Sequence, residues 1–260
     1  MAEFLVLGAG MAGIGAALAL QARGHDVRVI DRRGPGEETS HGNAGLIQAE
    51  AAEPYPMPRA PARLWQIATR QGNDIRWRAR AVARMAPALW SYYRASSPAR
   101  HARIAQSYAR LTLRAAEDHG PLIEAAGLWP LIRRTGFGEI PGSSAAFEPF
   151  RAESEALRDR WGLAMRVVDG AGLCAEDPAF RPGLPGAVIW DDSWSTTDPG
   201  ALTAGYAGLF AARGGSVIRA GIAGLRPAGL GWMVATTEGH ERAAQGVVAL
   251  GPLSPALLGP

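Results

Sequence analysis

The chain has 260 residues, 47% of them hydrophobic and 20% charged, a composition typical of a globular protein with one large or two small domains. The formal charge is only +3, all basic residues are arginines, and no nucleic-acid-binding motif accompanies them, so we expect no nucleic-acid partner. The sequence contains no apolar run of roughly 18 to 20 residues, which predicts that no helix spans a membrane. It also shows no signal-peptide pattern and has Cys174 as its single cysteine, which together predict a cytoplasmic protein.

The first 33 residues predict a strand, a tight turn, a helix and a second strand. Residues 4–7 form a short apolar run, and residues 14–22 are apolar and rich in alanine, as in a helix that packs on a sheet. Gly24 is placed to end that helix, and residues 27–30 form the next strand. This βαβ opening predicts a parallel sheet.

The turn inside this unit has the spacing of a dinucleotide-binding motif. The sequence "GAGMAG" places Gly8, Gly10 and Gly13 in the pattern G-x-G-x-x-G, directly after a strand and at the start of a helix. Asp31 ends the second strand, 23 positions after Gly8, where a carboxylate can accept hydrogen bonds from a ribose diol. The pattern predicts a dinucleotide site and does not separate NAD from FAD.

The stretch "ETSHGNAGLI", residues 38–47, consists mainly of small and turn-forming residues around one histidine. A plain surface turn explains this composition, and so does a backbone that must lie close to a flat ligand. The stretch begins soon after Asp31, the residue expected at the ribose. An FAD bound there would extend along this stretch toward its isoalloxazine ring, and small residues would let the backbone approach that ring. The stretch therefore favours FAD over NAD. His41 is either an active-site residue or, as we favour, a loop histidine bonded to backbone.

The rest of the chain predicts a mixed α/β fold. Helices are expected between about residues 60 and 126, and short β-like pieces surround a helix in residues 128–192. Asp198 and Pro199 predict the start of a helix that Gly214 and Gly215 close, and three strands follow. We therefore expect an α/β fold, a parallel sheet with a helical insertion and antiparallel strands, in four parts: residues 1–60, a helical section 61–127, strands and a helix in 128–192, and residues 193–260.

These segments, in the same order along the chain, resemble the FAD-dependent D-amino-acid oxidase superfamily, and within it the bacterial D-amino-acid dehydrogenase small-subunit type. The resemblance rests on "GAGMAGIGAALALQARGHDVRVID", "ETSHGNAGLI", "EPYPMPRAP", "GAVIWDDSWSTTDPGALTAGYAGLFAARGGSV" and "GVVALGPLSPALL". It implies FAD as the cofactor, an FAD-binding Rossmann-like domain made of residues 1–60 and 193–260, and substrate-domain strands in 128–192. It places the following residues around the cofactor: Gly8, Gly10, Met11, Ala12 and Gly13 at the pyrophosphate, Asp31 and Arg32 at the adenosine, Ser40, Asn43, Ala44 and Gly45 on the flavin side, Ile222 at the adenine, and Ala249, Leu250 and Gly251 near the pyrophosphate and ribityl chain. His41 lies in the same flavin-side loop and is a further candidate.

The resemblance also implies the reaction, in which a D-amino acid or related amine loses a hydride to the flavin and the imine hydrolyses to a 2-oxo acid and ammonia. Members of the family usually continue well past the equivalent of Pro260, so we expect the C-terminal third to be absent here, and no catalytic residue can be assigned. The alternatives are a non-catalytic flavin-binding fragment that needs a partner chain, and an NAD-linked dehydrogenase.

Several smaller features of the sequence have a functional and a purely structural interpretation. Arginines and aromatic residues mix in residues 61–94, which suits either contact with an anionic membrane surface and its quinones or an ordinary helical pair. The histidines show no metal-ligand spacing, so we predict no metal site. Tyr55 is expected to pack in a turn rather than to reach substrate, and Asp191 and Asp192 are expected to lie in a solvated turn.

Overall fold

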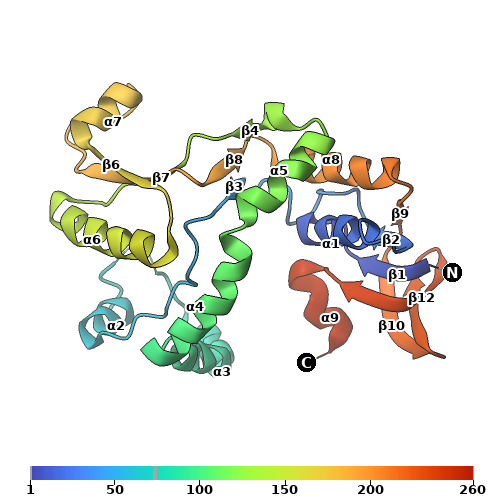
Figure 1. Ribbon diagram of the computed structural model, residues 1–260. Helices are drawn as coiled ribbons and strands as arrows, with labels where there is room; N and C mark the ends of the chain where they lie inside the picture. Colours follow the sequence, from blue (N-terminus) through green and yellow to red (C-terminus); the bar gives the residue numbers. More distant parts are fainter. Residues whose placement is uncertain (1, 73–74, 260) are drawn as a thin grey trace. The chain divides into compact units, whose positions relative to one another are not determined.

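The computed structural model describes residues 2–72 and 75–259, and the chain divides into two compact units. The first unit comprises residues 1–47, 116–137 and 193–260, and the second comprises residues 48–115 and 138–192. Figure 1 shows how the chain passes from one unit to the other and back. Each unit is therefore built from segments that lie far apart in the sequence.

The first unit is organised around a six-stranded sheet with the strand order β10-β11-β12-β1-β2-β9 (Figure 1). The four strands from β12 to β9 are parallel, and β10, β11 and β12 form an antiparallel meander. The prediction of a parallel sheet at the N-terminus is confirmed. The strands are β1 (Ala2–Leu7), β2 (Val27–Asp31), β9 (Ser216–Arg219), β10 (Ile222–Ala228), β11 (Gly231–Thr236) and β12 (Gly239–Val248).

Two helices accompany this sheet, and the sequence predicted both. Helix α1 (Met11–Gln21) follows β1 through the glycine turn, and Gly24 lies in the left-handed region with φ = +87° in the turn after the helix. Helix α8 (Pro199–Ala212) begins as expected, because the Asp198 side chain accepts a hydrogen bond from the Ala201 N–H at 2.8 Å. The two helices pack against each other, so α1 is fixed along one side.

Buried side chains of the sheet hold its strands and the C-terminal helix together. Leu5 and Leu7 of β1 and Ile30 of β2 form a cluster with Val234 of β11, and Leu257 of helix α9 (Ser254–Leu258) packs against it. Burying a side chain of this size stabilises the fold by roughly 1.5–3 kcal/mol. Helix α9 therefore belongs to the fold of this unit.

A small three-stranded sheet completes the first unit and differs from the sequence-based expectation. Residues 128–134, "LWPLIRR", are one of the β-like pieces expected in 128–192, but only Ile132–Arg133 of them is a strand, β4, because Trp129–Leu131 forms a 3-10 turn with Pro130 inside it. Strand β8 (Trp194–Thr196) lies between β4 and β3 (Leu46–Ile47). Proline has no N–H to donate to a sheet, which explains the shorter strand.

The second unit combines helices with a three-stranded sheet of order β5-β7-β6. Two or three helices were expected between residues 60 and 126, whereas the described residues of this stretch form four, because Ser97 and Pro98 start a new helix and the last helix begins near Ala115. A short helix after Asp169 was also missed. The elements are α2 (Pro61–Ala68), α3 (Ala79–Ala95), α4 (Pro98–Thr112), α5 (Ala115–Ala125, mostly in the first unit), β5 (Phe137–Glu139, at the boundary between the units), α6 (Ser144–Trp161), β6 (Met165–Asp169), α7 (Gly170–Glu176) and β7 (Gly186–Trp190).

Strand β7 is the buried centre of this sheet. All five of its residues are buried, and the Trp190 indole donates a hydrogen bond to Glu139 at 2.8 Å. Asp191 forms an ion pair with Arg166 at 3.1 Å, and Asp192 accepts from the Ala164 N–H at 2.8 Å. Both carboxylates therefore support the turn after β7, as the sequence led us to expect.

A half-buried histidine is expected to make the first unit sensitive to acid. His119 of α5 lies 2.8 Å from the Tyr206 hydroxyl of α8, and burial lowers the pKa of His119, with Asp118 opposing the shift. In the unfolded chain a histidine takes up a proton near pH 6.5, whereas folded His119 resists protonation. The stability that this histidine contributes is therefore present above about pH 6.5 and is lost as the pH falls toward the lowered folded pKa.

We therefore expect the urea midpoint of the wild-type chain to fall between pH 7.5 and pH 5.5, and the fall to be smaller in a His119→Gln variant. Equilibrium urea titrations at the two pH values measure both differences. Equal falls in the two proteins would show that His119 does not cause the pH dependence.

Within the described residues, no helix is both long and apolar enough to cross a membrane.

Candidate functional site

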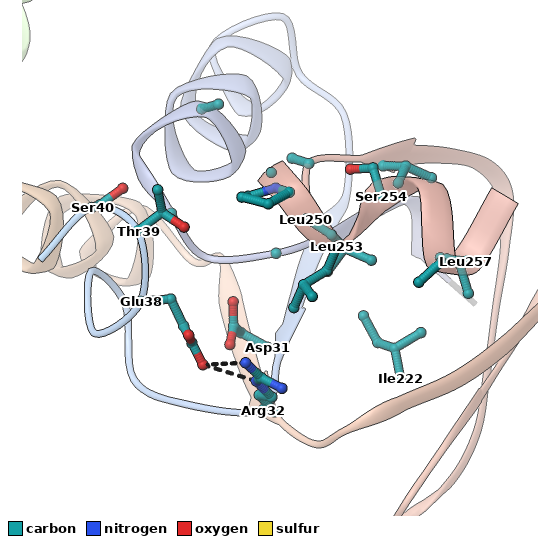
Figure 2. Close-up of a pocket in the computed structure, with 18 of the residues that line it drawn as sticks. Asp31, Arg32, Glu38, Thr39, Ser40, Ile222, Leu250, Leu253, Ser254 and Leu257 are labelled. Atoms are coloured by element: carbon teal, nitrogen blue, oxygen red, sulfur yellow. Dashed lines mark hydrogen bonds and ion pairs between the residues drawn. The ribbon is translucent and has the colours of Figure 1, made fainter. Parts of the chain in front are cut away.

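The first unit contains a cavity of about 1060 Å³ beside the glycine turn (Figure 2). Ligand pockets in proteins usually measure about 300–1,000 Å³, so this cavity has room for a large ligand. Its walls come from the start of α1, the end of β2, the segment after it, the start of β10 and the chain from Val248 to Leu257.

The glycine turn forms one wall of the cavity, and its geometry explains why Gly8 and Gly10 in this wall are glycines. Gly8 has φ = +113°, and a Cβ there would collide with the Ala249 carbonyl. Gly10 has an ordinary extended backbone, but a Cβ there would lie 3.2 Å from the Ser40 hydroxyl oxygen. Gly10 therefore keeps the space in front of the helix open, as close approach of a phosphate requires.

Asp31 connects the end of β2 to the glycine turn. Its Oδ2 accepts a hydrogen bond from the Ala9 N–H at 2.7 Å, and its Oδ1 accepts from the Arg33 N–H at 2.9 Å. Hydrogen bonds to a charged acceptor contribute about 1.5–3 kcal/mol. The carboxylate therefore orders the turn as well as facing the cavity, a structural role that the sequence motif alone does not reveal.

Glu38 also lines the cavity, and its carboxylate pairs with the positively charged arginines that follow Asp31. Its Oε1 lies 2.8 Å from Arg32 (Figure 2) and also 3.1 Å from Arg33, which lies outside the cavity lining. The two arginines that could have attracted a 2′-phosphate are thus engaged with a carboxylate. Sequence reasoning missed Glu38, although its position seven residues after Asp31 and its opposite charge to Arg32 were visible signals.

Ser40 connects the next segment to the helix. Its hydroxyl oxygen accepts a hydrogen bond from the Met11 N–H at 2.9 Å, and Met11 is the first residue of α1. Gly10, which precedes the helix, has no side chain to do this. Ser40 therefore acts as a helix cap that comes from a distant segment, and the proton of its own hydroxyl remains available to a ligand.

We expect Ser40→Ala to lower the free energy of unfolding by about 1 kcal/mol, since it leaves the Met11 N–H without its acceptor. Urea denaturation of the chain measures this change. Ser144→Ala, in the exposed first turn of α6, is a matched control and should change stability by less than about 0.5 kcal/mol. Equal effects of the two substitutions would contradict the capping role.

The remaining small residues of the segment 38–47 have structural reasons to be small. Gly45 has φ = +66°, and a Cβ there would contact the Thr196 carbonyl oxygen of β8 at 2.5 Å. The Asn43 side chain accepts a hydrogen bond from the Gly45 N–H at 2.8 Å, which closes the turn before β3. His41 is exposed, and its ring lies near the start of α8 at Gly200. The segment is thus a structured turn whose first residues, Glu38 to Ser40, and Asn43 reach the cavity.

The opposite wall is apolar and comes from the end of the chain. Strand β12 ends at Val248, and a 3-10 turn (Gly251–Leu253) then leads into α9. Leu253 and Leu257 face the cavity together with Ile222, on the other side from Asp31 (Figure 2). The sequence marked Ala249, Leu250 and Gly251, but not the helix that follows, although "PLSPALL" is a short apolar run with a proline start.

Twelve of the sixteen predicted site residues line this cavity, and four do not. The twelve are Gly8, Gly10, Met11, Ala12, Asp31, Arg32, Ser40, Asn43, Ile222, Ala249, Leu250 and Gly251. Those outside the lining are Gly13, His41, Ala44 and Gly45. The lining residues that sequence reasoning missed are Glu38, Thr39, Ala223, Val248, Pro252, Leu253, Ser254, Ala256 and Leu257.

Several curated proteins are similar to the chain along nearly its whole length. It is 31% identical over 270 residues to the D-amino acid dehydrogenase of Cereibacter sphaeroides, covering 99% of this chain and 60% of that protein. It is 28% identical over 259 residues to a D-amino-acid oxidase of Bradyrhizobium diazoefficiens, covering 96% of this chain and 60% of that protein. The chain thus spans about 60% of the length of these relatives.

Solved structures share the fold. Glycine oxidase from Geobacillus kaustophilus superposes with a TM-score of 0.65 at 19% identity, over 98% of this chain and 57% of that one. An L-amino acid deaminase from Proteus vulgaris superposes with a TM-score of 0.67 at 18% identity, over 99% of this chain and 49% of that one. The sequence profile of the DAO family, FAD dependent oxidoreductase, matches residues 3–260. The chain therefore belongs to the DAO family of FAD-dependent oxidoreductases.

Proposed function

We propose that the chain binds FAD in the cavity of the first unit and serves the oxidation of the C–N bond of a D-amino acid or related amine. The single observation that carries this proposal is the cavity itself, which joins a glycine turn, a helix N-terminus and a carboxylate in one wall. The names of the curated relatives support the choice of a D-amino acid.

The residues around the cavity fit a dinucleotide. The open space at Gly10, which a Cβ would narrow, and the N-terminus of α1 suit a pyrophosphate. Asp31 suits a ribose diol, and Arg32 is paired with Glu38 rather than directed at a 2′-phosphate. The apolar wall with Ile222 and Leu257 suits an adenine ring. These assignments favour FAD over a phosphorylated nicotinamide cofactor.

Bound FAD would supply the hydride acceptor for oxidation of the amine at its α-carbon, and the product imine would hydrolyse in water to a 2-oxo acid and ammonia. This chain contributes binding and orientation. Asp31 holds the glycine turn through Ala9, and Ser40 holds the start of α1 through Met11. We propose that Asn43, at the far end of the same segment, lies toward the flavin side of the cofactor.

A second candidate follows from the length of the relatives, which extend well beyond the region matched here. In this alternative the chain holds the cofactor, and a partner polypeptide completes the substrate site.

For the completed enzyme we propose a quinone as the electron acceptor. The quinone would lie in a membrane that the protein contacts at its surface.

Anaerobic addition of amino acids to the flavin-loaded chain tests the proposal. We expect D-alanine or D-proline to bleach the visible flavin band, and L-alanine to leave it unchanged. Flavin-loaded protein that no D-amino acid bleaches would support the second candidate. Bleaching by L-alanine alone would contradict the proposed substrate class.

A further inference from the structure

An arginine side chain lies on a pair of tryptophan rings in the first unit. The guanidinium carbon of Arg134 lies 4.8 Å from the centre of the Trp194 ring and 5.9 Å from that of Trp129. The two tryptophan rings lie 5.7 Å apart and are tilted by 55°. Attraction between a guanidinium group and an indole face holds the arginine in place and leaves the N–H donors at its edge available.

Both tryptophans are fixed by neighbouring elements of the same unit. The Trp129 indole donates a hydrogen bond to Glu124 of α5, and a Cβ at Gly120 of α5 would lie 3.8 Å from the Trp194 ring. Trp194 is also the first residue of β8, where it lies opposite Ile47 of β3. The two rings therefore form a preformed platform, which positions the guanidinium group before a ligand binds.

Arg134 differs from the preceding arginine in what its side chain contacts. The Arg133 guanidinium donates hydrogen bonds to the Pro130 and Ile132 carbonyl oxygens at 3.1 and 3.2 Å. Arg134 is exposed, and within the part of the chain that the structure describes it forms no ion pair and donates no hydrogen bond. A planar fork of free donors, held on an aromatic platform, is suited to binding a carboxylate.

The small sheet β3-β8-β4 connects this arginine to the flavin side of the proposed cofactor site (Figure 1). Asn43 lines the cavity, and β3 begins three residues later. The Thr196 N–H donates a hydrogen bond to the Gly45 carbonyl oxygen at 2.7 Å, which joins β8 to the same segment. Strand β4, directly before Arg134, pairs with the other side of β8. Two strand spacings, about 10 Å, therefore separate β4 from β3.

This separation fits the far end of a substrate side chain rather than the α-carboxylate. The α-carbon must lie against the flavin and carries its own carboxylate directly, whereas the second carboxylate of an acidic amino acid lies several bonds away. We propose that Arg134, on the platform of Trp129 and Trp194, binds the side-chain carboxylate of an acidic D-amino acid. The proposal rests on the proposed FAD-dependent oxidation and names the class of amino acid that the site prefers.

Isothermal titration calorimetry with the flavin-loaded chain tests the carboxylate site. The probes are glutarate, which has no amine to oxidise, and glutaramide, which has the same shape without charge. We expect glutarate to bind the wild-type chain about tenfold or more tightly than glutaramide, because charge-assisted hydrogen bonds contribute about 10- to 100-fold in affinity. Arg134→Gln should remove this difference. Arg134→Lys should keep only part of it, because lysine lacks the planar fork.

Anaerobic flavin reduction tests which carboxylate of the substrate Arg134 binds. D-Glutamate and D-glutamine share their α-groups and differ in the charge of the side chain. We expect the half-saturating concentration of D-glutamate to be lower by about tenfold or more, and Arg134→Gln to make the two equal with little change in the limiting rate. An equal loss of affinity for both substrates in Arg134→Gln would assign the arginine to the α-carboxylate and overturn the proposal.

Arg133→Gln is the matched control, because Arg133 is exposed and contacts carbonyl oxygens of its own turn. This variant should bind glutarate within about twofold of wild type. Equal effects of Arg133→Gln and Arg134→Gln, or equal binding of glutarate and glutaramide to the wild-type chain, would overturn the proposal. If no D-amino acid reduces the flavin, the proposed oxidation fails for this chain alone, and the calorimetric comparison still decides whether Arg134 binds a carboxylate.

Discussion

Gly10→Val is expected to abolish tight FAD binding while the chain stays folded. Gly10 has φ = −72° and ψ = 176°, an extended conformation that valine adopts readily, so the backbone needs no change. The new side chain would begin 3.2 Å from the Ser40 hydroxyl oxygen and occupy the space in front of α1. Losing close approach of the phosphates to the helix N-terminus should cost about 3 kcal/mol, or about 100-fold in the dissociation constant.

Flavin fluorescence titration measures this loss, and thermal unfolding measures the fold. The control is Gly142→Val in an exposed turn of the second unit, where a Cβ meets no atom within 4 Å. The control should bind FAD as wild type does. Unchanged flavin affinity in Gly10→Val would show that Gly10 does not lie at the pyrophosphate.

Gly13→Ala is expected to damage the fold itself. A Cβ at Gly13 would collide with the backbone carbonyl of Gly8 and lie 3.4 Å from the Ala249 side chain. Both neighbours belong to the turn and the strand end that α1 rests on, so neither can move without disturbing the sheet. Overpacking of this kind costs about 3 kcal/mol, which corresponds to roughly 10 °C in the melting temperature.

Gly15→Ala provides the matched comparison within the same helix. A Cβ at Gly15 meets no atom within 4 Å, and alanine is the better helix former by about 1 kcal/mol. This variant should therefore melt at the same temperature as wild type or above it. Similar melting temperatures for Gly13→Ala and Gly15→Ala would contradict the close packing of α1 on the turn.

The sequence predicted those parts of the fold that local chemistry dictates. Asp198 and Pro199 start α8 because a side-chain acceptor and a fixed φ act within one helical turn. Gly8, Gly10 and Asp31 could be recognised because the motif has a fixed spacing along one βαβ unit. The contacts that start α8 lie within a few residues of one another in the sequence. The residues of the glycine motif lie farther apart, but the motif fixes the spacing between them.

Features that depend on packing between distant segments were not predictable in the same way. Helix α9 has only five residues, and it is held by Leu257 against the sheet rather than by its own propensity. The ion pair of Glu38 with Arg32 and the cap that Ser40 gives to Met11 depend on how the segment after β2 folds back. Spacing alone does not define that path.

The composition of the segment 38–47 left two explanations open, a surface turn and a backbone close to a flat ligand. Gly45 is small because a Cβ there would meet the backbone of β8, and Ala44 lies outside the cavity lining. Ser40 and Asn43 do line the cavity. Packing and ligand contact both select small residues, and only the three-dimensional arrangement separates the two causes.

The most direct test of the account is the equilibrium binding of FAD and of NADH to the purified chain. We predict that one FAD binds per chain and stays bound through gel filtration, that NADH does not compete with it, and that Gly10→Val loses it. Saturable NADH binding by a chain that retains no FAD would contradict the assignment of the cavity to flavin.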